Sequence, residues 1–191
     1  MAAGVLMVVA TLRHPSRETA ATIIASEPRL VAADVVYTLA WLRVLLGLPG
    51  LYASQRGSMG RLGLAGFLTA FAGTYLIAVT GNFGFLAPVL AKQSPAVLDS
   101  INQYVPVLII NGLAAILFMI GYVLLGIATM RTATLPHWSG VLVALGAPAD
   151  LLRFGIARLV TTTAWPIAIF GSVSLGVGLG WPSYRLWHTS T

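Results

Sequence analysis

Long apolar stretches alternate with short polar connectors along this chain. Five stretches have the length and apolarity of helices that cross a bilayer, and a shorter one precedes them. Continuous apolar runs predict helices, because barrel strands alternate apolar and polar residues in pieces of about ten residues. We therefore predict an all-α polytopic membrane bundle in one domain, 1–191, with about six transmembrane helices at 1–12, 30–52, 62–80, 104–130, 138–158 and 165–187.

The first apolar stretch is short for a membrane span. As a helix its 12 residues reach only about 18 Å, against a hydrocarbon core of roughly 30 Å. It lacks the positive start of a signal peptide, and no small-residue cleavage site is obvious before Arg13, so we expect it to be retained. We also expect this helix either to begin before Met1 or to continue past Pro15.

The two larger connectors contain helix signals of their own. Ser16 is an N-cap candidate with an acidic residue in the following turn, and Ser94 precedes Pro95, a favoured first helical residue. We predict a short interfacial helix in each connector. The segment 82–90 is too apolar for a freely solvated loop, and we interpret it as interfacial, with a lid over the bundle as the alternative.

Composition and charge agree with a membrane class. Hydrophobic residues make up 58% of the chain and charged residues 8%, whereas about a quarter of the residues of a soluble domain are charged. The net charge of +6 comes from arginines near the ends of apolar segments, which indicate topology rather than nucleic-acid binding. We expect the lipid bilayer and other membrane proteins as partners, and no nucleic acid.

The basic residues also predict an orientation. The short connectors on the side of the two termini carry arginines and no acidic residue, whereas the opposite side mixes basic residues with acidic ones. Positive residues in short loops stay in the cytoplasm. We therefore predict a multi-pass protein of the inner (plasma) membrane with both termini cytoplasmic.

Several kinds of chemistry are missing from the sequence. Without cysteine the chain has no disulfide, thiolate nucleophile or iron–sulfur ligand. All three histidines lie in or beside connectors, which argues against a haem inside the bilayer, and no metal-ligand spacing is present. We predict no catalytic residue, no metal and no cofactor, while a bound lipid, quinone or pigment stays open.

Charged residues in the middle of two apolar segments form the candidate site. Arg43 lies about 14 Å and Asp150 about 18 Å from the same membrane side, so the two form an ion pair if their helices are neighbours. Arg153 can reach the opposite surface or share the carboxylate of Asp150. Pro148, beside Gly146, should kink the helix before Asp150. Such charges are costly in lipid, so they indicate either an ion pair that holds two helices together or a transport site.

Small residues at four-residue spacing line two of the predicted helices. Because lipid removes the hydrophobic drive for helices to associate, close backbone approach supplies the packing energy. We expect both stripes to be helix contacts within the bundle, with an oligomer interface as the alternative. They comprise Gly66, Ala70 and Thr74, and Ser172, Gly176 and Gly180.

One stretch resembles a known group of proteins. The run 135–148, Leu-Pro-His-Trp-Ser-Gly-Val-Leu-Val-Ala-Leu-Gly-Ala-Pro, is similar to the Leu-Pro-x-Trp-x-Gly run that opens the penultimate helix of small multispanning bacterial proteins of unknown function. Arg13-His14-Pro15, the stretch 60–63 and the stretch 184–187 are similar to that group as well. The resemblance implies a six-helix bacterial inner-membrane protein and no particular activity.

Two functional hypotheses remain. The first is a non-catalytic structural or accessory protein, as a subunit of a larger membrane complex, for example an energy-transducing one. The second is a small solute or proton transporter that uses the Arg43 and Asp150 site. If the two helices that carry these residues are neighbours, an ion pair with a structural role is favoured.

Overall fold

The computed structural model describes residues 2–14, 19–132, 134–157 and 164–189, and within these residues all regular structure is helical. The predicted all-α class is therefore confirmed. The elements are α1 (Ala2–Arg13), α2 (Ala20–Ala25), α3 (Glu27–Gly81), the 3-10 helix η1 (Asn82–Phe85), α4 (Ala87–Gln93), α5 (Pro95–Gln103), α6 (Val105–Met130), α7 (His137–Ala157) and α8 (Ala164–Thr189).

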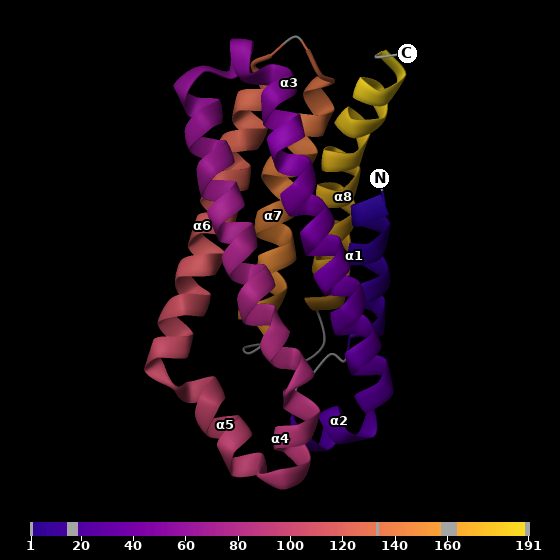
Figure 1. The fold of residues 1–191 in the computed structure, drawn as a ribbon, viewed down its shortest axis with the longest axis vertical. Helices are drawn as coiled ribbons and strands as arrows, with labels where there is room; N and C mark the ends of the chain where they lie inside the picture. The colour runs from indigo at the N-terminus through magenta and orange to yellow at the C-terminus, as the bar shows by residue number, and fades with distance from the viewer. Residues whose placement is uncertain (1, 15–18, 133, 158–163, 190–191) are drawn as a thin grey trace.

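The longest element, α3, is a helical hairpin. Gly60 has φ 59° and ψ −158°, a conformation that only glycine adopts at little cost. The limb 27–59 therefore leads to one end of the molecule, and the limb 61–81 returns from it (Figure 1). The two limbs correspond to the second and third predicted helices. The connector that we expected between them is helical up to Met59, since it contains no proline.

The long segments run side by side along the long axis of the molecule (Figure 1). The hairpin α3 packs against α6 and α1, α8 packs against α1 and α7, and α7 packs against α6. The segments thus follow one another around a closed ring. The short helices α2, α4 and α5 lie at the end opposite the α3 corner, and the first turn of α1 and the last turn of α8 lie in the half that contains this corner (Figure 1).

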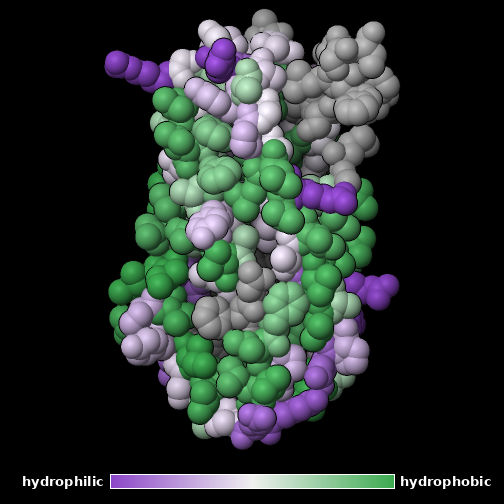
Figure 2. All heavy atoms as spheres, in the orientation of Figure 1, coloured by the Kyte–Doolittle hydropathy of each residue, from purple (hydrophilic) through white to green (hydrophobic). Residues whose placement is uncertain are grey.

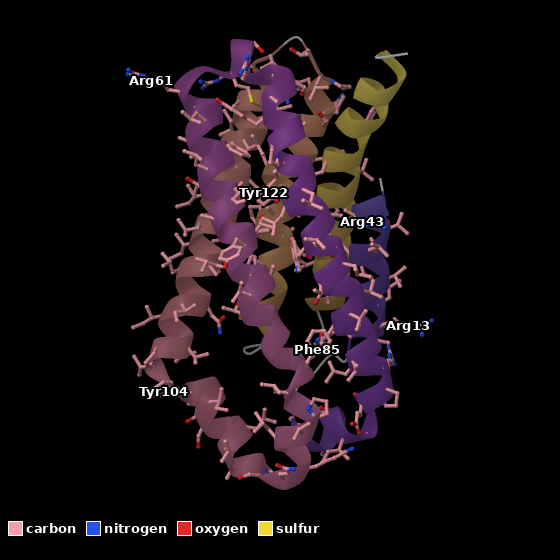
Figure 3. The ribbon with its side chains drawn as sticks, viewed as in Figure 1. Arg13, Arg43, Arg61, Phe85, Tyr104 and Tyr122 are labelled. Atoms are coloured by element: carbon pink, nitrogen blue, oxygen red, sulfur yellow. The ribbon has the colours of Figure 1, made fainter. Side chains whose placement is uncertain are left out.

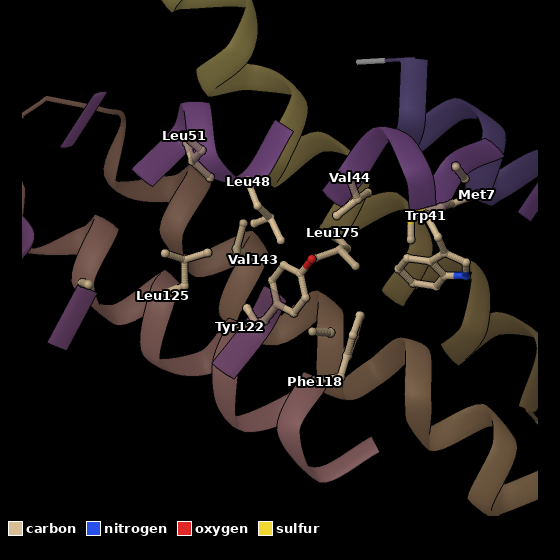
Figure 4. Packing of buried hydrophobic residues seen from close by; sticks show 14 of the residues in the cluster. Met7, Trp41, Val44, Leu48, Leu51, Phe118, Tyr122, Leu125, Val143 and Leu175 are labelled. Carbon is tan, nitrogen blue, oxygen red and sulfur yellow. The ribbon is translucent and has the colours of Figure 1, made fainter. Parts of the chain in front are cut away.

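An apolar cluster fills the centre of this ring. Trp41 meets Phe118 edge to face at 5.5 Å between ring centroids, and Phe118 lies 4.6 Å from the ring of Tyr122. Val143 of α7 and Leu175 of α8 close the cluster from the opposite side (Figure 4). Residues from α3, α6, α7 and α8 therefore share one core.

The face of the molecule seen in Figure 2 is apolar over most of its length, and hydrophilic residues gather towards its two ends. On α6, Val105, Ile109 and Ile116 are each at least half exposed. Among the described residues, α3 and α6 are long and apolar enough to cross a membrane, and α1 and part of α8 are shorter apolar helices.

The short helices start close to the predicted positions. Thr19 caps α2. Its side chain accepts a hydrogen bond from the backbone N–H of Thr22, and the Thr22 side chain accepts one from the backbone N–H of Thr19. Ser16, the N-cap that we expected, lies outside the described residues. The helix α5 begins at Pro95 after Ser94, although the Ser94 side chain makes no capping bond.

Candidate functional site

Asp150 lies inside the bundle, where a serine of the neighbouring helix binds it. The residue is 2% exposed, and Ser172 Oγ donates a hydrogen bond of 2.7 Å to its Oδ1. Gly171 permits this contact, since a Cβ there would stand 2.2 Å from the Asp150 backbone nitrogen. A glycine followed by a serine on α8 thus sets a hydroxyl directly against the carboxylate.

Two further hydroxyls extend this contact across the bundle. Thr11 Oγ1, on α1, lies 3.1 Å from Ser172 Oγ, and Tyr37 Oη, on α3, lies 2.6 Å from Thr11 Oγ1. Thr11 and Ser172 are buried, and Tyr37 is partly buried. We call Tyr37, Thr11 and Ser172 the hydroxyl string. It joins α3, α1 and α8 and ends on Asp150 of α7.

The donors of the string are fixed by counting hydrogens. Each hydroxyl has one hydrogen to donate. While the Asp150 carboxylate is ionised it can only accept, so Ser172 donates to it and the bond between Thr11 and Ser172 uses the Thr11 hydrogen. The bond between Tyr37 and Thr11 must then use the Tyr37 hydrogen. All three hydrogens therefore point towards the carboxylate.

A histidine and a second carboxylate lie at the head of the string. The rings of His14 and Tyr37 are 6.1 Å apart between centroids and meet edge to face. His14 Nε2 lies 3.7 Å from Oδ1 of Asp34, which is 8% exposed. A Cβ on Gly84 would stand 2.4 Å from Asp34 Oδ2, so η1 packs directly on this carboxylate. In this structure η1 thus contacts the first limb of α3, and the choice between an interfacial segment and a lid stays a prediction.

The expected pair between Arg43 and Asp150 is wrong. Arg43 is exposed and makes no ion pair with Asp150 among the described side chains. Its helix packs on α1 and α6, whereas Asp150 faces α8, so the apolar core separates the two residues. Similar depth along two helices does not bring side chains together when the helices are not neighbours.

Arg43 instead borders a groove between α1, α3 and α8. The groove has a volume of about 210 Å³, and its walls include Gly4, Gly47 and Gly176. Figure 3 shows Arg43 on the side of α3 that lies near α1. The guanidinium is therefore accessible from the outside of the bundle rather than enclosed with Asp150.

The remaining residues of the predicted charge site lie on α7. The helix continues through Pro148, whose ring removes the bond to the carbonyl of Ala144. The side chain of Arg153 lies outside the described residues. Among the described side chains of the predicted charge site, the structure connects Asp150 to a polar network and does not connect Arg43 to it.

The two small-residue stripes lie at helix contacts. On α3, Gly66 meets the backbone of Leu125, and Thr74 bonds Tyr122 at 3.0 Å. On α8, Gly176 touches Gly4 of α1: a Cβ on either would stand 2.4 Å from the Cα of the other. Ala70 is fully buried, Ser172 belongs to the string, and Gly180 borders the Arg43 groove.

Sequence reasoning missed most of the polar network. In the sequence His14 lies beside a connector, and the predicted charge site does not include Asp34. One signal was present in the sequence: Asp34 lies four residues into the 30–52 apolar segment, one helical turn before Thr38. Thr38 indeed donates to the Asp34 carbonyl at 2.8 Å. The hydroxyls of the string carried no comparable signal.

Comparisons with protein-family models, with curated proteins and with solved structures give no match for this chain. The resemblance carried by the run 135–148 therefore stays a prediction. In the part of the chain that the structure describes, no group of three His, Asp or Glu residues could hold a metal ion. The candidate site is defined by its own geometry, a buried carboxylate at the end of a directed row of hydroxyls.

Proposed function

We propose that this chain is a polytopic helical protein of the bacterial inner membrane, with six passes and both termini cytoplasmic. The apolar exterior, the span-length helices α3 and α6, and the alternating direction of the long segments support this proposal. The basic connectors on the side of the α3 corner support the orientation.

Within the membrane we propose a non-catalytic role, as a structural or accessory subunit of a larger assembly. The observation that supports it best is Asn111, which is exposed on α6 between apolar residues. Beside it, Gly112 has open space where a side chain would stand. Small residues and amide side chains are what membrane helices use to associate, because the amide gains a partner that lipid does not offer. We therefore propose that a transmembrane helix of another protein binds here.

Native co-purification of the tagged full chain tests this role. We expect a stoichiometric membrane-protein partner with the wild type and its loss with Asn111→Leu. The matched control is Ile109→Leu, which changes an exposed α6 residue without changing polarity and should keep the partner. A wild-type chain that purifies without any partner, or a partner retained by Asn111→Leu, would contradict the proposal.

The transporter hypothesis loses its predicted site, because Arg43 and Asp150 do not meet. A carrier would have to use Asp150 with the hydroxyl string instead. Solute or proton flux into liposomes that survives Asp150→Asn unchanged would remove this second candidate.

A further inference from the structure

We infer that the hydroxyl string is a proton relay that loads and unloads Asp150 from the end of the bundle where α2, α4 and η1 lie. This activity is separate from the proposed assembly role, and neither depends on the other. The argument rests on the order of the donors, on the burial of the carboxylate and on the groups at the head of the string.

The string has the geometry that proton transfer needs. The oxygen-to-oxygen distances from Tyr37 to Thr11 and from Ser172 to Asp150 are 2.6 and 2.7 Å, which is typical of O–H···O hydrogen bonds, and the distance from Thr11 to Ser172 is longer, at 3.1 Å. Its hydrogens all point the same way, towards Asp150. Hydroxyls that donate and accept in one direction can pass a proton without any side chain leaving its position.

The transfer balances at every atom. A proton arriving on Tyr37 Oη forms a new O–H bond there, and the original Tyr37 hydrogen moves to Thr11 Oγ1. The Thr11 hydrogen moves to Ser172 Oγ, and the Ser172 hydrogen moves to Asp150 Oδ1. Each hydroxyl gains one proton and loses one, so the net change is the conversion of the carboxylate to a neutral carboxylic acid. The reverse transfer, from Asp150 back to Tyr37, releases one proton and restores the carboxylate and the starting order.

The buried carboxylate gives this proton a reason to move. Burial of an ionised carboxylate is costly unless the charge is paired. Ser172 is the hydrogen-bond partner of Asp150 among the described side chains, and Arg43 is not within reach. Asp150 Oδ1 accepts the last hydrogen bond of the string, so this carboxylate is the end point of the relay.

The head of the string carries a group that exchanges protons near neutral pH. His14 lies edge-on to Tyr37 and beside Asp34, and an imidazole gains and loses its proton in this range. Among the described charged side chains at this end, Arg13 points away from the bundle (Figure 3), and three others have partners. Arg29 binds the backbone carbonyls of Leu12 and Arg13, and Lys92 pairs with Glu27. Because the rings of His14 and Tyr37 are in contact, we place the source of the proton that arrives on Tyr37 at His14, whose imidazolium becomes a neutral imidazole when it releases that proton.

The test follows the protonation of Asp150 by infrared spectroscopy after a light-triggered drop in pH, with the purified full chain in lipid vesicles. The carboxylic-acid band is assigned by its loss in Asp150→Asn. Thr11→Val interrupts the string and should slow the appearance of the band by about tenfold or more, whereas Thr11→Ser should restore the rate.

The chain offers a matched control for a lost buried hydroxyl. Thr74 and Tyr122 form a hydroxyl pair of 3.0 Å outside the string, so Thr74→Val should leave the rate unchanged. If Thr11→Val does not fold, Tyr37→Phe and Tyr122→Phe form the second pair of variants. The relay would be overturned if Thr11→Val protonated Asp150 as fast as the wild type, or if Asp150 did not become protonated at all. It would also be overturned if Thr74→Val slowed protonation as much as Thr11→Val, or if Tyr122→Phe slowed it as much as Tyr37→Phe.

Discussion

Gly121 of α6 lies directly against the backbone of Ala70 in α3. A Cβ on Gly121 would stand 2.1 Å from the Ala70 nitrogen and 2.4 Å from its Cα. Because both are main-chain atoms, no side-chain rotation can make room. The contact holds the second limb of α3 against α6 beside the Thr74 and Tyr122 pair.

Alanine at Gly121 should therefore destabilise the bundle. We expect a loss of about 1–3 kcal/mol in the free energy of unfolding, the usual cost of forcing extra atoms into a packed interior. The matched variant is Gly112→Ala on the same helix, which has open space and should stabilise by up to about 1 kcal/mol. Thermal unfolding in mild detergent measures both, and equal effects would contradict a direct backbone contact.

The corner of α3 makes a second prediction. Gly60 has a positive φ, so Gly60→Ala should cost about 1–3 kcal/mol of stability through backbone strain alone. Gly57, three residues earlier, is helical with open space around it, so Gly57→Ala should be neutral or stabilising. Chemical denaturation of the two variants measures the difference. Equal stability would mean that the corner does not need glycine.

The proposed orientation can be tested by single-cysteine labelling, because the natural chain contains no cysteine. Ser58 lies near the α3 corner and Gln93 ends α4 at the opposite end, and both are exposed. In intact cells a membrane-impermeant maleimide should label Gln93→Cys, whereas Ser58→Cys should react only after permeabilisation. The reverse pattern would invert the proposed topology, and labelling of both in intact cells would contradict a spanning bundle.

The sequence was sufficient to predict the helices but not to predict which helices are neighbours. Apolar lengths predicted the long segments, and four-residue spacing of small residues predicted faces that the structure places at helix contacts. Depth along two helices suggested the wrong ion pair, since spacing says nothing about the order of helices around a ring. The string joins residues as far apart as Thr11 and Ser172, 161 positions along the chain, so no local pattern could predict it.

The central claim is that Asp150 is bound through Ser172 and not through Arg43. Double-mutant cycles on the free energy of unfolding test it most directly, with Asp150→Ala combined with Ser172→Ala and, separately, with Arg43→Ala. We predict a coupling of about 1.5–3 kcal/mol between Asp150 and Ser172, as for hydrogen bonds to charged groups. The Arg43 cycle should be additive within about 0.5 kcal/mol. A larger coupling of Asp150 to Arg43 than to Ser172 would contradict the account.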